Sequence, residues 1–456
     1  MSLIRSINPW TGEVMREYIP TGPKEIEGKL KSAQQTFESW KDLSSNQKSD
    51  LMKSAAQVLR TRKEEFARII SMEMGKVIKE SRAEVEKCAW VCDFYAEKAA
   101  EYLAPEYLTL PDEKTAKIIY QPLGAILAVM PWNFPFWQVF RFAAPTLMAG
   151  NVGLLKHASN VPQCALAIQS IFEEAGFPIG AFQSLLIDST TTLDLLKDER
   201  VKAVSLTGSE KAGAAVASVA GAQIKKSLLE LGGSDPFIVL RDADVAAAAE
   251  TAAKARMINL GQSCIAAKRF IIEEAVYEEF LKVFVQKIAG MKQGNPLDES
   301  SDYACMARPD LAQELYAQVE KSKMMGAKVI LGGTKPNSES AEFVPTILTD
   351  IPDSAPAFSE ELFGPVASVF KVNNAQEAIV LANATEFGLG ASLWTNDQEL
   401  GAKLAEQIES GAVFLNAMVA SHPHLPFGGI KKSGFGRELS RQGILEFVNH
   451  KTVYLG

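Results

Sequence analysis

The segment Asn259-Leu-Gly-Gln-Ser-Cys264 places a cysteine in a setting suited to nucleophilic chemistry. It follows an Ala-rich stretch that is predicted to be helical, and Gly261 can end that helix so that the thiol lies on a tight loop. A nucleophilic cysteine needs a reachable sulfur with backbone N–H groups nearby, because the thiolate is the reactive form. The cysteines at positions 88, 92, 164 and 305 fit the commoner role of small buried apolar residues. Cys264 is the candidate nucleophile.

Two other polar residues stand in settings that can serve such a nucleophile. Glu230 lies among leucines and precedes Gly232-Gly233, and burial raises a carboxyl pKa toward the range of a useful general base. Asn133 lies within Pro131-Trp-Asn-Phe-Pro135, where a fixed amide N–H can bind an oxyanion. Each also has a plainer explanation, because Glu230 can bond a glycine turn and Asn133 can complete one.

Ser205-Leu-Thr-Gly-Ser209 has the pattern of a strand, a glycine and a helix start. A phosphate can bind the exposed N–H groups at the beginning of such a helix. The sequence has neither GxGxxG nor GxxxxGK[ST] at a strand-to-helix junction, which excludes the common phosphate loops. Ser209 also fits a simple helix N-cap, and the two roles are compatible.

The elements that position these residues follow an α/β pattern. Apolar spacing predicts helices over Pro23–Trp40, Asn46–Met74 and Lys79–Glu101. Short apolar runs then alternate with helical ones; the strand candidates are Lys117–Tyr120, Gly124–Met130, Val152–Leu155, Phe182–Ile187 and Val201–Leu206, and the helices are Pro162–Ala175, Leu193–Leu196 and Glu210–Val219. This alternation predicts parallel strands with helical crossovers and helices on both faces of the sheet.

A second α/β cycle begins after the glycine pair 232–233. Its first strand and helix are predicted at Phe237–Leu240 and Asp244–Ile258. Later strand candidates are Lys328–Leu331, Val366–Phe370, Ala391–Trp394 and Lys451–Leu455. The glycine pair is the only boundary that the composition suggests, and we find no repeat of fixed period.

Composition narrows the class of protein. A chain of 456 residues predicts two or three domains. The net charge of −8, with no long Lys/Arg block, argues against a general nucleic-acid surface, and an anionic substrate would need a local cation. No apolar run is long enough to span a membrane, residues 1–23 are polar, and the odd count of five cysteines suits a reducing compartment, so we expect a cytoplasmic protein. Four scattered histidines offer no ligand cluster, and we expect no metal.

Taken together and in this order, the motifs resemble the aldehyde dehydrogenase superfamily. The resemblance runs from about Asn8-Pro-Trp-Thr-Gly12 to the C-terminus. It is carried by PWNFP, LELGG, GQSC, EELFGP (Glu360–Pro365) and PFGGIKKSG (Pro426–Gly434). The resemblance implies that Cys264 is the nucleophile, that Glu230 is the general base, and that Asn133 and the Cys264 backbone N–H bind the oxyanion. It also implies a cofactor site that comprises Trp132, Lys156, Ser159, Gly208, Ser209, Glu361 and Phe363.

The resemblance further implies three domains and self-association. By this likeness residues 1–103 and 122–231 bind the cofactor in a variant dinucleotide fold, and residues 232–441 form the catalytic α/β domain. Residues 104–121 and 442–456 form a small β arm. Such arms extend a neighbour's sheet in relatives, and an isolated two-stranded arm is marginal in water, so we expect a dimer or tetramer.

Position 159 bears on the cofactor. An acidic residue there would bond the ribose hydroxyls of NAD and repel a 2′-phosphate. Ser159 is small and neutral, and Lys156 lies three residues before it. We therefore expect NADP to be preferred, with NAD accepted less well; the alternative is that Ser159 is a neutral surface residue and that another loop decides.

For the substrate, family likeness places Gln138 and Arg141 along the tunnel on one predicted helix face. A guanidinium matches a carboxylate bidentately. Ser263 and Ser421 can donate hydrogen bonds to an anion, and Phe427 supplies an apolar wall. This set is similar to the succinate-semialdehyde branch of the family. The open alternative is that Arg141 pairs with an internal carboxylate and that the tunnel takes other aliphatic aldehydes or semialdehydes.

At two positions the sequence departs from the pattern of the family, and three other classes of protein are alternatives to a hydrolytic dehydrogenase. His424 stands where relatives of this branch often carry an arginine, which predicts weaker or pH-dependent binding of the acid group. Ala266 stands where a second cysteine would allow a redox switch. A coenzyme A-acylating dehydrogenase needs no general base, so Glu230 favours hydrolysis. A non-catalytic relative would usually lack one of the three catalytic residues, and all three are present. A thiol esterase or protease would need a histidine partner for the cysteine, and no histidine stands in a motif that suggests one.

Overall fold

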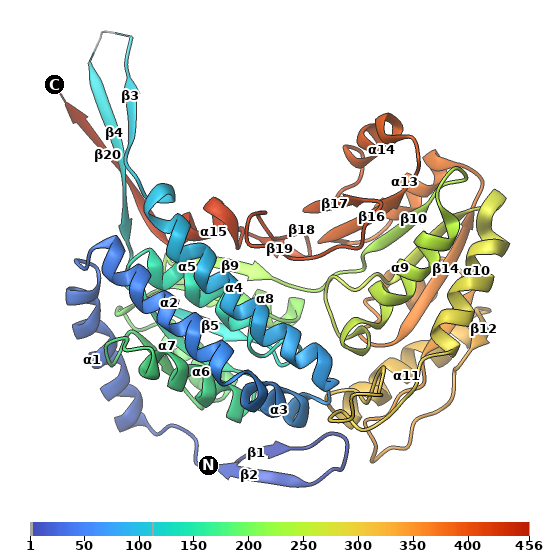
Figure 1. Cartoon of the computed structure of the whole chain (residues 1–456), viewed down its shortest axis with the longest axis horizontal. Helices are drawn as coiled ribbons and strands as arrows, with labels where there is room; N and C mark the ends of the chain where they lie inside the picture. Colours follow the sequence, from blue (N-terminus) through green and yellow to red (C-terminus); the bar gives the residue numbers. More distant parts are fainter. Residues whose placement is uncertain (1–2, 112–113, 456) are drawn as a thin grey trace.

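The computed structural model describes residues 3–111 and 114–455. Residues 1–2, 112–113 and 456 fall within the predicted cofactor domain and arm but lie outside the described residues. The chain forms two α/β bodies side by side, and a narrow β arm projects from the first of them (Figure 1). This arrangement agrees with the predicted α/β class.

The first body is built on a six-stranded sheet with the order β19-β9-β8-β5-β6-β7. Its strands are β5 (Ala125–Met130), β6 (Val152–His157), β7 (Phe182–Ser184), β8 (Val201–Thr207), β9 (Lys226–Glu230) and β19 (Gly434–Phe435). All neighbours are parallel except β19, which pairs antiparallel with β9. The apolar runs are buried within this sheet, as expected for a parallel sheet that is covered on both faces.

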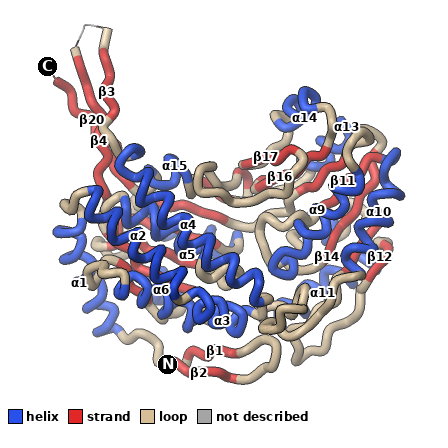
Figure 2. Tube along the Cα trace, viewed as in Figure 1, coloured by secondary structure: helices blue, strands red, loops and turns tan. Residues whose placement is uncertain are grey.

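Helices cover both faces of this sheet (Figure 2). They are α1 (Pro23–Trp40), α2 (Ser45–Thr61), α3 (Lys63–Met74), α4 (Ile78–Tyr102), α5 (Trp137–Met148), α6 (Pro162–Glu174), α7 (Ser189–Leu195), α8 (Glu210–Ala222) and α15 (Ser440–Leu445). The prediction of one helix over 46–74 was wrong, because the chain breaks at Arg62 between α2 and α3. The N-terminal hairpin of β1 (Ile4–Ile7) and β2 (Val14–Tyr18) was not predicted.

The second body contains a seven-stranded sheet with the order β12-β13-β14-β11-β10-β16-β17. Its strands are β10 (Pro236–Val239), β11 (Arg269–Glu273), β12 (Lys328–Leu331), β13 (Thr346–Thr349), β14 (Val366–Val372), β16 (Gly390–Trp394) and β17 (Ala412–Leu415). Its helices are α9 (Val245–Met257), α10 (Glu274–Ala289), α11 (Pro309–Met324), α12 (Pro356–Ser359), α13 (Ala375–Asn383) and α14 (Gln398–Ala405). Two short strands, β15 (Phe387–Gly388) and β18 (Ile430–Lys431), form a separate antiparallel pair.

The arm is a three-stranded sheet with the order β20-β4-β3. Its strands are β3 (Glu106–Thr109), β4 (Thr115–Pro122) and β20 (Val448–Leu455), all antiparallel. The arm extends away from the first body, so its strands have few neighbours within the chain (Figure 1). Within residues 3–111 and 114–455, no helix is long and apolar enough to cross a bilayer.

Candidate active site

The loop that carries Cys264 owes its shape to three consecutive left-handed residues. Helix α9 ends at Met257. Asn259 and Leu260 both have φ of 51°, and Gly261 has φ of 72°. A Cβ at Gly261 would lie 2.3 Å from the carbonyl oxygen of Gly364, so the close approach requires glycine. The expected helix break is therefore present, and it begins before Gly261.

Buried cations hold this loop by its backbone. The Lys268 ammonium donates to the carbonyl oxygens of Ser263, Cys264 and Ala266 at 3.0, 2.8 and 3.1 Å. The Arg256 guanidinium donates to the Gly261 carbonyl at 2.7 Å. Bonds between charged donors and backbone oxygens are stronger than neutral ones, so the nucleophile's backbone is well fixed. The sequence analysis missed both cations, whose spacing follows no motif.

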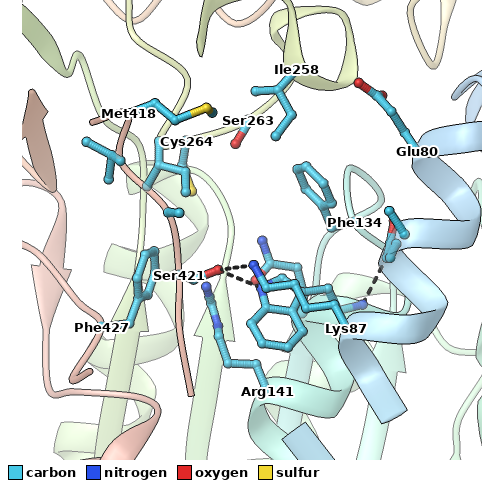
Figure 3. A pocket seen from close by; sticks show the side chains of 17 residues that line it. Glu80, Lys87, Phe134, Arg141, Ile258, Ser263, Cys264, Met418, Ser421 and Phe427 are labelled. Carbon is cyan, nitrogen blue, oxygen red and sulfur yellow. Dashed lines mark hydrogen bonds between the residues drawn. The ribbon is translucent and has the colours of Figure 1, made fainter. Parts of the chain in front are cut away.

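Cys264 is the only cysteine among the described residues that is not fully buried. It lies between two cavities and lines both of them. We name these the Arg141 cavity and the Trp132 cavity after one residue in each. Figure 3 shows the sulfur facing the Arg141 cavity. The sulfur can thus be reached by ligands from two sides, as the sequence analysis expected.

The thiol is not ionised at rest. Removal from water raises the pKa of Cys264 to about 12, and the cations of Arg141 and Lys268 lower it only in part. A proton must leave the sulfur when the reaction begins, so the site needs a proton acceptor.

Glu230 ends strand β9 and is 1% exposed. Burial raises the pKa of its carboxyl to about 8, against the lowering effect of Arg141. Neither carboxyl oxygen has a side-chain hydrogen-bond partner among the described residues, although the backbone N–H of Gly429 lies close enough to lower the pKa. Glu230 lines neither cavity, yet its charge raises the pKa of Cys264, so the two groups are within electrostatic range.

Asn133 lines the Trp132 cavity together with Cys264. Its Nδ2 donates to the carbonyl oxygen of Gln262 at 3.1 Å. The Asn259 amide in turn donates to the Asn133 carbonyl at 2.7 Å. Since an amide nitrogen carries two protons, one N–H of Asn133 remains for a ligand oxygen beside the sulfur.

Two buried groups that the sequence analysis missed fix the loop around Asn133. His157 accepts the Ala158 N–H at Nδ1, so Nε2 carries the proton and donates to the Pro135 carbonyl at 2.8 Å. Burial lowers the pKa of His157 to about 4, which keeps the ring neutral. Glu84 accepts the backbone N–H groups of Phe136 and Trp137 at 2.9 and 3.0 Å and forms a buried ion pair with Lys76.

The Trp132 cavity has a volume of about 260 Å³. Eight of the predicted site residues line it: Trp132, Asn133, Gln138, Gly208, Ser209, Cys264, Glu361 and Phe363. The rings of Trp132 and Phe363 meet edge to face, with centroids 5.8 Å apart. Ser209 caps α8, whose first N–H groups face this region. Glu361 Oε1 accepts the Gly233 N–H at 2.9 Å and lies 3.4 Å from the Lys268 ammonium.

Ser159 is exposed and lines a third cavity of about 600 Å³, which we name the Ser159 cavity. Asp188, Arg5 and Arg308 line it as well. Lys156 lies next to the last residue of β6. Burial lowers the pKa of its ammonium. Lys156 is thus the one predicted cofactor residue that lines none of the three cavities.

The Arg141 cavity, of about 230 Å³, brings all five predicted substrate residues together. They are Gln138, Arg141, Ser263, Ser421 and Phe427, and they come from α5, the nucleophile loop and the segment 416–427 (Figure 3). Lys87 of α4 also lines this cavity and was not predicted. Most of the other lining residues are apolar, such as Phe134, Ile258 and Met418.

Arg141 has an internal partner. Its guanidinium forms an ion pair with the buried carboxylate of Glu438 and lies 3.8 Å from Glu230. Its carbon Cζ lies 4.5 Å from the Phe427 ring centroid. The alternative of an internal carboxylate partner is therefore realised, although Arg141 still lines the cavity.

His424 does not line the Arg141 cavity. Its exposed ring packs 4.5 Å from Phe94 and 5.0 Å from His422. A role for His424 in holding the acid group therefore has no support from its position. Ala266 is buried two residues after Cys264. In the part of the chain that the structure describes, no group of three His, Cys, Asp or Glu side chains could hold a metal ion.

The family model described as the aldehyde dehydrogenase family matches residues 2–453. The chain belongs to the aldehyde dehydrogenase family and is an NAD(P)-dependent aldehyde dehydrogenase in class. This confirms the resemblance and the three-domain α/β fold that it implied.

Particular relatives narrow the likeness. The chain is 55% identical over 452 residues to a probable succinate-semialdehyde dehydrogenase [NADP(+)] of Synechocystis sp., covering 99% of both chains. It is 45% identical over 454 residues to succinate-semialdehyde dehydrogenase [NADP(+)] 1 of Mycobacterium tuberculosis, again with 99% of both covered. The solved structure of succinic semialdehyde dehydrogenase from Streptococcus pyogenes with NADP+ matches with a TM-score of 0.97, 35% identity and 99% of both chains covered.

Proposed function

We propose that this enzyme oxidises succinate semialdehyde to succinate with NADP. The observation that carries the proposal is the Arg141 cavity, in which a nucleophilic sulfur and two cationic side chains line one mainly apolar space that also contains Glu80 and Glu84. An aldehyde that reaches Cys264 can there place a carboxylate near Arg141 and Lys87. The names of the relatives from Synechocystis and M. tuberculosis support the same substrate and cofactor.

The chain's own groups divide the work of the first step. The Cys264 sulfur attacks the aldehyde carbon and loses its proton, which Glu230 is suited to take because its pKa is raised toward neutrality. The free N–H of Asn133 and the Cys264 backbone N–H hold the negative oxygen that forms. One such donor contributes about 3–4 kcal/mol to a transition state.

The Trp132 cavity fits a nicotinamide ribose. The buried hydroxyl of Thr207 has no hydrogen-bond partner among the described residues, and it lines that cavity with Glu361 and the start of α8. The chemistry that bound NADP would supply at this site is acceptance of a hydride at its nicotinamide. Trp132, Phe363 and Glu361 would orient the ring and ribose, and Gly208 and Ser209 would face the pyrophosphate.

Hydrolysis completes the proposed cycle. Glu230, when ionised, can take a proton from water that attacks the thioester at Cys264. A coenzyme A-acylating reaction is the alternative, and it would need Glu230 for the thiol proton but not to activate water. A broader preference for aliphatic aldehydes is the second alternative, because Arg141 already has Glu438 as a partner.

Arg141 provides the test of the substrate. We expect Arg141→Met to raise the KM for succinate semialdehyde by about 10- to 100-fold, the loss of one charged hydrogen-bonded contact. The KM for pentanal, a neutral aldehyde of similar length, should rise far less. Steady-state rates with both aldehydes measure this.

Because Arg141→Met strands the Glu438 carboxylate, the double variant Arg141→Met/Glu438→Gln is the matched partner. It should show the same selective loss. Equal losses for both aldehydes in the double variant would remove the carboxylate role and leave general aldehyde oxidation.

Ser159 provides the test of the cofactor. We expect Ser159→Glu to raise the KM for NADP by about one to two orders of magnitude, because a carboxylate would repel the 2′-phosphate. The KM for NAD should stay the same or fall. Initial rates with each cofactor at saturating aldehyde measure the change, and an unchanged NADP preference would mean that another loop decides.

Domain roles, assembly and location follow as further parts of the proposal. We assign residues 1–103 and 122–231 to cofactor binding, 232–441 to catalysis, and 104–121 with 442–456 to self-association. The arm strands β20 and β3 and the strand β17 at the edge of the second sheet all have an unpaired side within the described chain, which supports strand addition between copies. A monomer in sedimentation at assay concentration would contradict this self-association.

The five unpaired cysteines support a reducing compartment such as the cytoplasm.

A further inference from the structure

Lys87 is a cation that no motif singled out. It lies on α4, and its ammonium reaches the Arg141 cavity, where it donates to the Ser421 hydroxyl at 2.8 Å. It also lies 4.3 Å from the ring centroid of Trp137. Figure 3 shows it on the side of the cavity opposite Phe427, close to Ser421.

Lys87 has no carboxylate partner. Among residues 3–111 and 114–455, no Asp or Glu oxygen lies within 4.0 Å of its ammonium. Lys76, on the chain just before the same helix, is paired with Glu84. A partly buried ammonium without an anion is unfavourable, and such a group is suited to receive one.

Arg141 differs from Lys87 in this respect. The Arg141 charge is balanced by Glu438, with Glu230 close behind. The carboxyl groups of Glu80 and Glu84 also line the cavity, but Glu84 is paired with Lys76. Lys87 is therefore a cation of the cavity that has no direct carboxylate partner among the described residues. Since the chain has a net charge of −8, a local cation is what an anionic substrate requires.

Hydrogen-bond accounting at Ser421 points the same way. Its oxygen accepts from the Lys87 ammonium and from Trp137 Nε1, at 2.8 and 3.1 Å. Both lone pairs are then used, and only the hydroxyl proton remains to be donated. No acceptor for that proton lies within hydrogen-bonding distance in the described part of the chain. Lys87 thus fixes Ser421 as a donor into the cavity.

We propose that Lys87 is a specificity residue that binds the substrate's carboxylate, directly through its ammonium and indirectly by holding Ser421 as a donor. This inference rests on the proposed function, because it names a second residue for the same acid group. In this arrangement Lys87 and Ser421 hold one side of the carboxylate and Arg141 the other.

The charge on Lys87 can be titrated near neutrality. Burial, and to a smaller extent the Arg141 cation, lowers the pKa of its ammonium to about 8, while Cys88 and Glu84 on its own helix act in the opposite sense. His422, on the segment that carries Ser421, also faces it. Below about pH 8 the ammonium is charged and binds an anion; above it the charge is lost.

The experiment compares kcat/KM for succinate semialdehyde with kcat/KM for pentanal, and the ratio of the two is the readout. We expect Lys87→Met to lower this ratio by about 10- to 100-fold, the effect of losing one charged contact. Lys98→Met, on the exposed part of the same helix where Lys98 pairs with Glu101, is the matched control and should leave the ratio unchanged.

The pH dependence separates binding from a structural role. In the unaltered enzyme the ratio should fall as pH rises through about 8. Lys87→Arg, which stays charged at every pH used, should keep a high ratio and abolish that fall. A merely structural lysine would affect both aldehydes alike and leave the pH profile of the ratio flat.

The outcomes distinguish the two proposals. If the unaltered enzyme shows no preference for succinate semialdehyde over pentanal, the proposed function fails, and this inference fails with it. If the preference is present but Lys87→Met keeps the full ratio, only the role of Lys87 is overturned. A Lys87→Met protein that does not fold leaves the Lys87→Arg profile to decide, and a pH-dependent ratio in that variant overturns the inference.

Discussion

Replacing Cys264 with alanine is expected to lower kcat/KM for aldehyde oxidation by more than about a thousandfold, as deletion of a nucleophile does in other enzymes. The sulfur is the only thiol among the described residues that lines a cavity, and it lies where the Arg141 and Trp132 cavities meet. Formation of reduced cofactor, followed by absorbance, measures the loss. Cofactor binding, measured by fluorescence quenching of the protein, should persist.

Cys305→Ala is the matched control for Cys264→Ala. Cys305 is 1% exposed and packs its sulfur against Gly75. It lines neither of the two cavities that Cys264 lines. Its removal should affect stability by about 1 kcal/mol and leave turnover intact. Aldehyde oxidation at normal speed by Cys264→Ala would show that the covalent route is wrong.

The catalytic residues could be predicted because each lies in a short run of residues with a local physical signature. Gly261 marks the loop before Cys264, the leucines around Glu230 predict burial, and the prolines around Asn133 predict a fixed loop. These signals depend only on near neighbours in sequence. The structure brings Cys264 and Asn133 to one cavity and leaves Glu230 just outside it.

Lys87 and Glu438 could not be predicted, because their partners are remote. Lys87 and Ser421 are separated by 334 positions, and Arg141 meets Glu438 only after the chain returns from the second sheet to the first. No spacing rule links such pairs. For the same reason the sequence could suggest that Arg141 lines the tunnel but could not show that its charge was already balanced.

The fold was predicted well where apolar runs were continuous and poorly where the pattern was weak. Strands β5, β6 and β8 are mainly apolar stretches and were found within a few residues. The break at Arg62 was missed because neither glycine nor proline marks it. The β1–β2 hairpin is mostly exposed and lacks the alternation of a half-buried strand.

The protonation state of the nucleophile shows what local motifs leave out. The leucines around Glu230 predicted a raised carboxyl pKa, and burial raises it to about 8, but no motif indicated that burial also raises the pKa of Cys264 to about 12. Desolvation depends on everything packed around a group, including Arg141 and Lys268. At neutral pH the Cys264 thiol therefore holds its proton, and Glu230 is ionised in a minority of the molecules. Removal of the thiol proton by that ionised form becomes part of catalysis.

That conclusion gives Glu230→Gln its expected result. We expect steady-state turnover to fall by about 10²- to 10⁴-fold, the usual contribution of a general base. If the loss falls mainly on hydrolysis, the thioester on Cys264 should accumulate after about one reduced cofactor per active site. If it falls mainly on removal of the thiol proton, that burst should be absent. Rapid mixing measures that burst, and mass spectrometry of the quenched protein measures the acyl group. Glu446→Gln, a carboxylate paired with Lys226, is the control and should turn over normally.

The pH profile of turnover then separates Glu230 from Lys87. An ionised Glu230 can accept a proton and a protonated one cannot. The rate with pentanal should therefore rise as pH increases through about 8, the pKa of Glu230. Pentanal lacks a carboxylate, so the charge on Lys87 does not contribute to this rise. Glu230→Gln should abolish it. Persistence of the rise in Glu230→Gln, or normal hydrolysis without it, would assign the base to another group. In Glu230→Gln, release of the trapped acyl group by coenzyme A but not by water at high pH would instead favour acyl transfer. Hydrolysis needs an ionised carboxylate to activate water, and acyl transfer to coenzyme A does not.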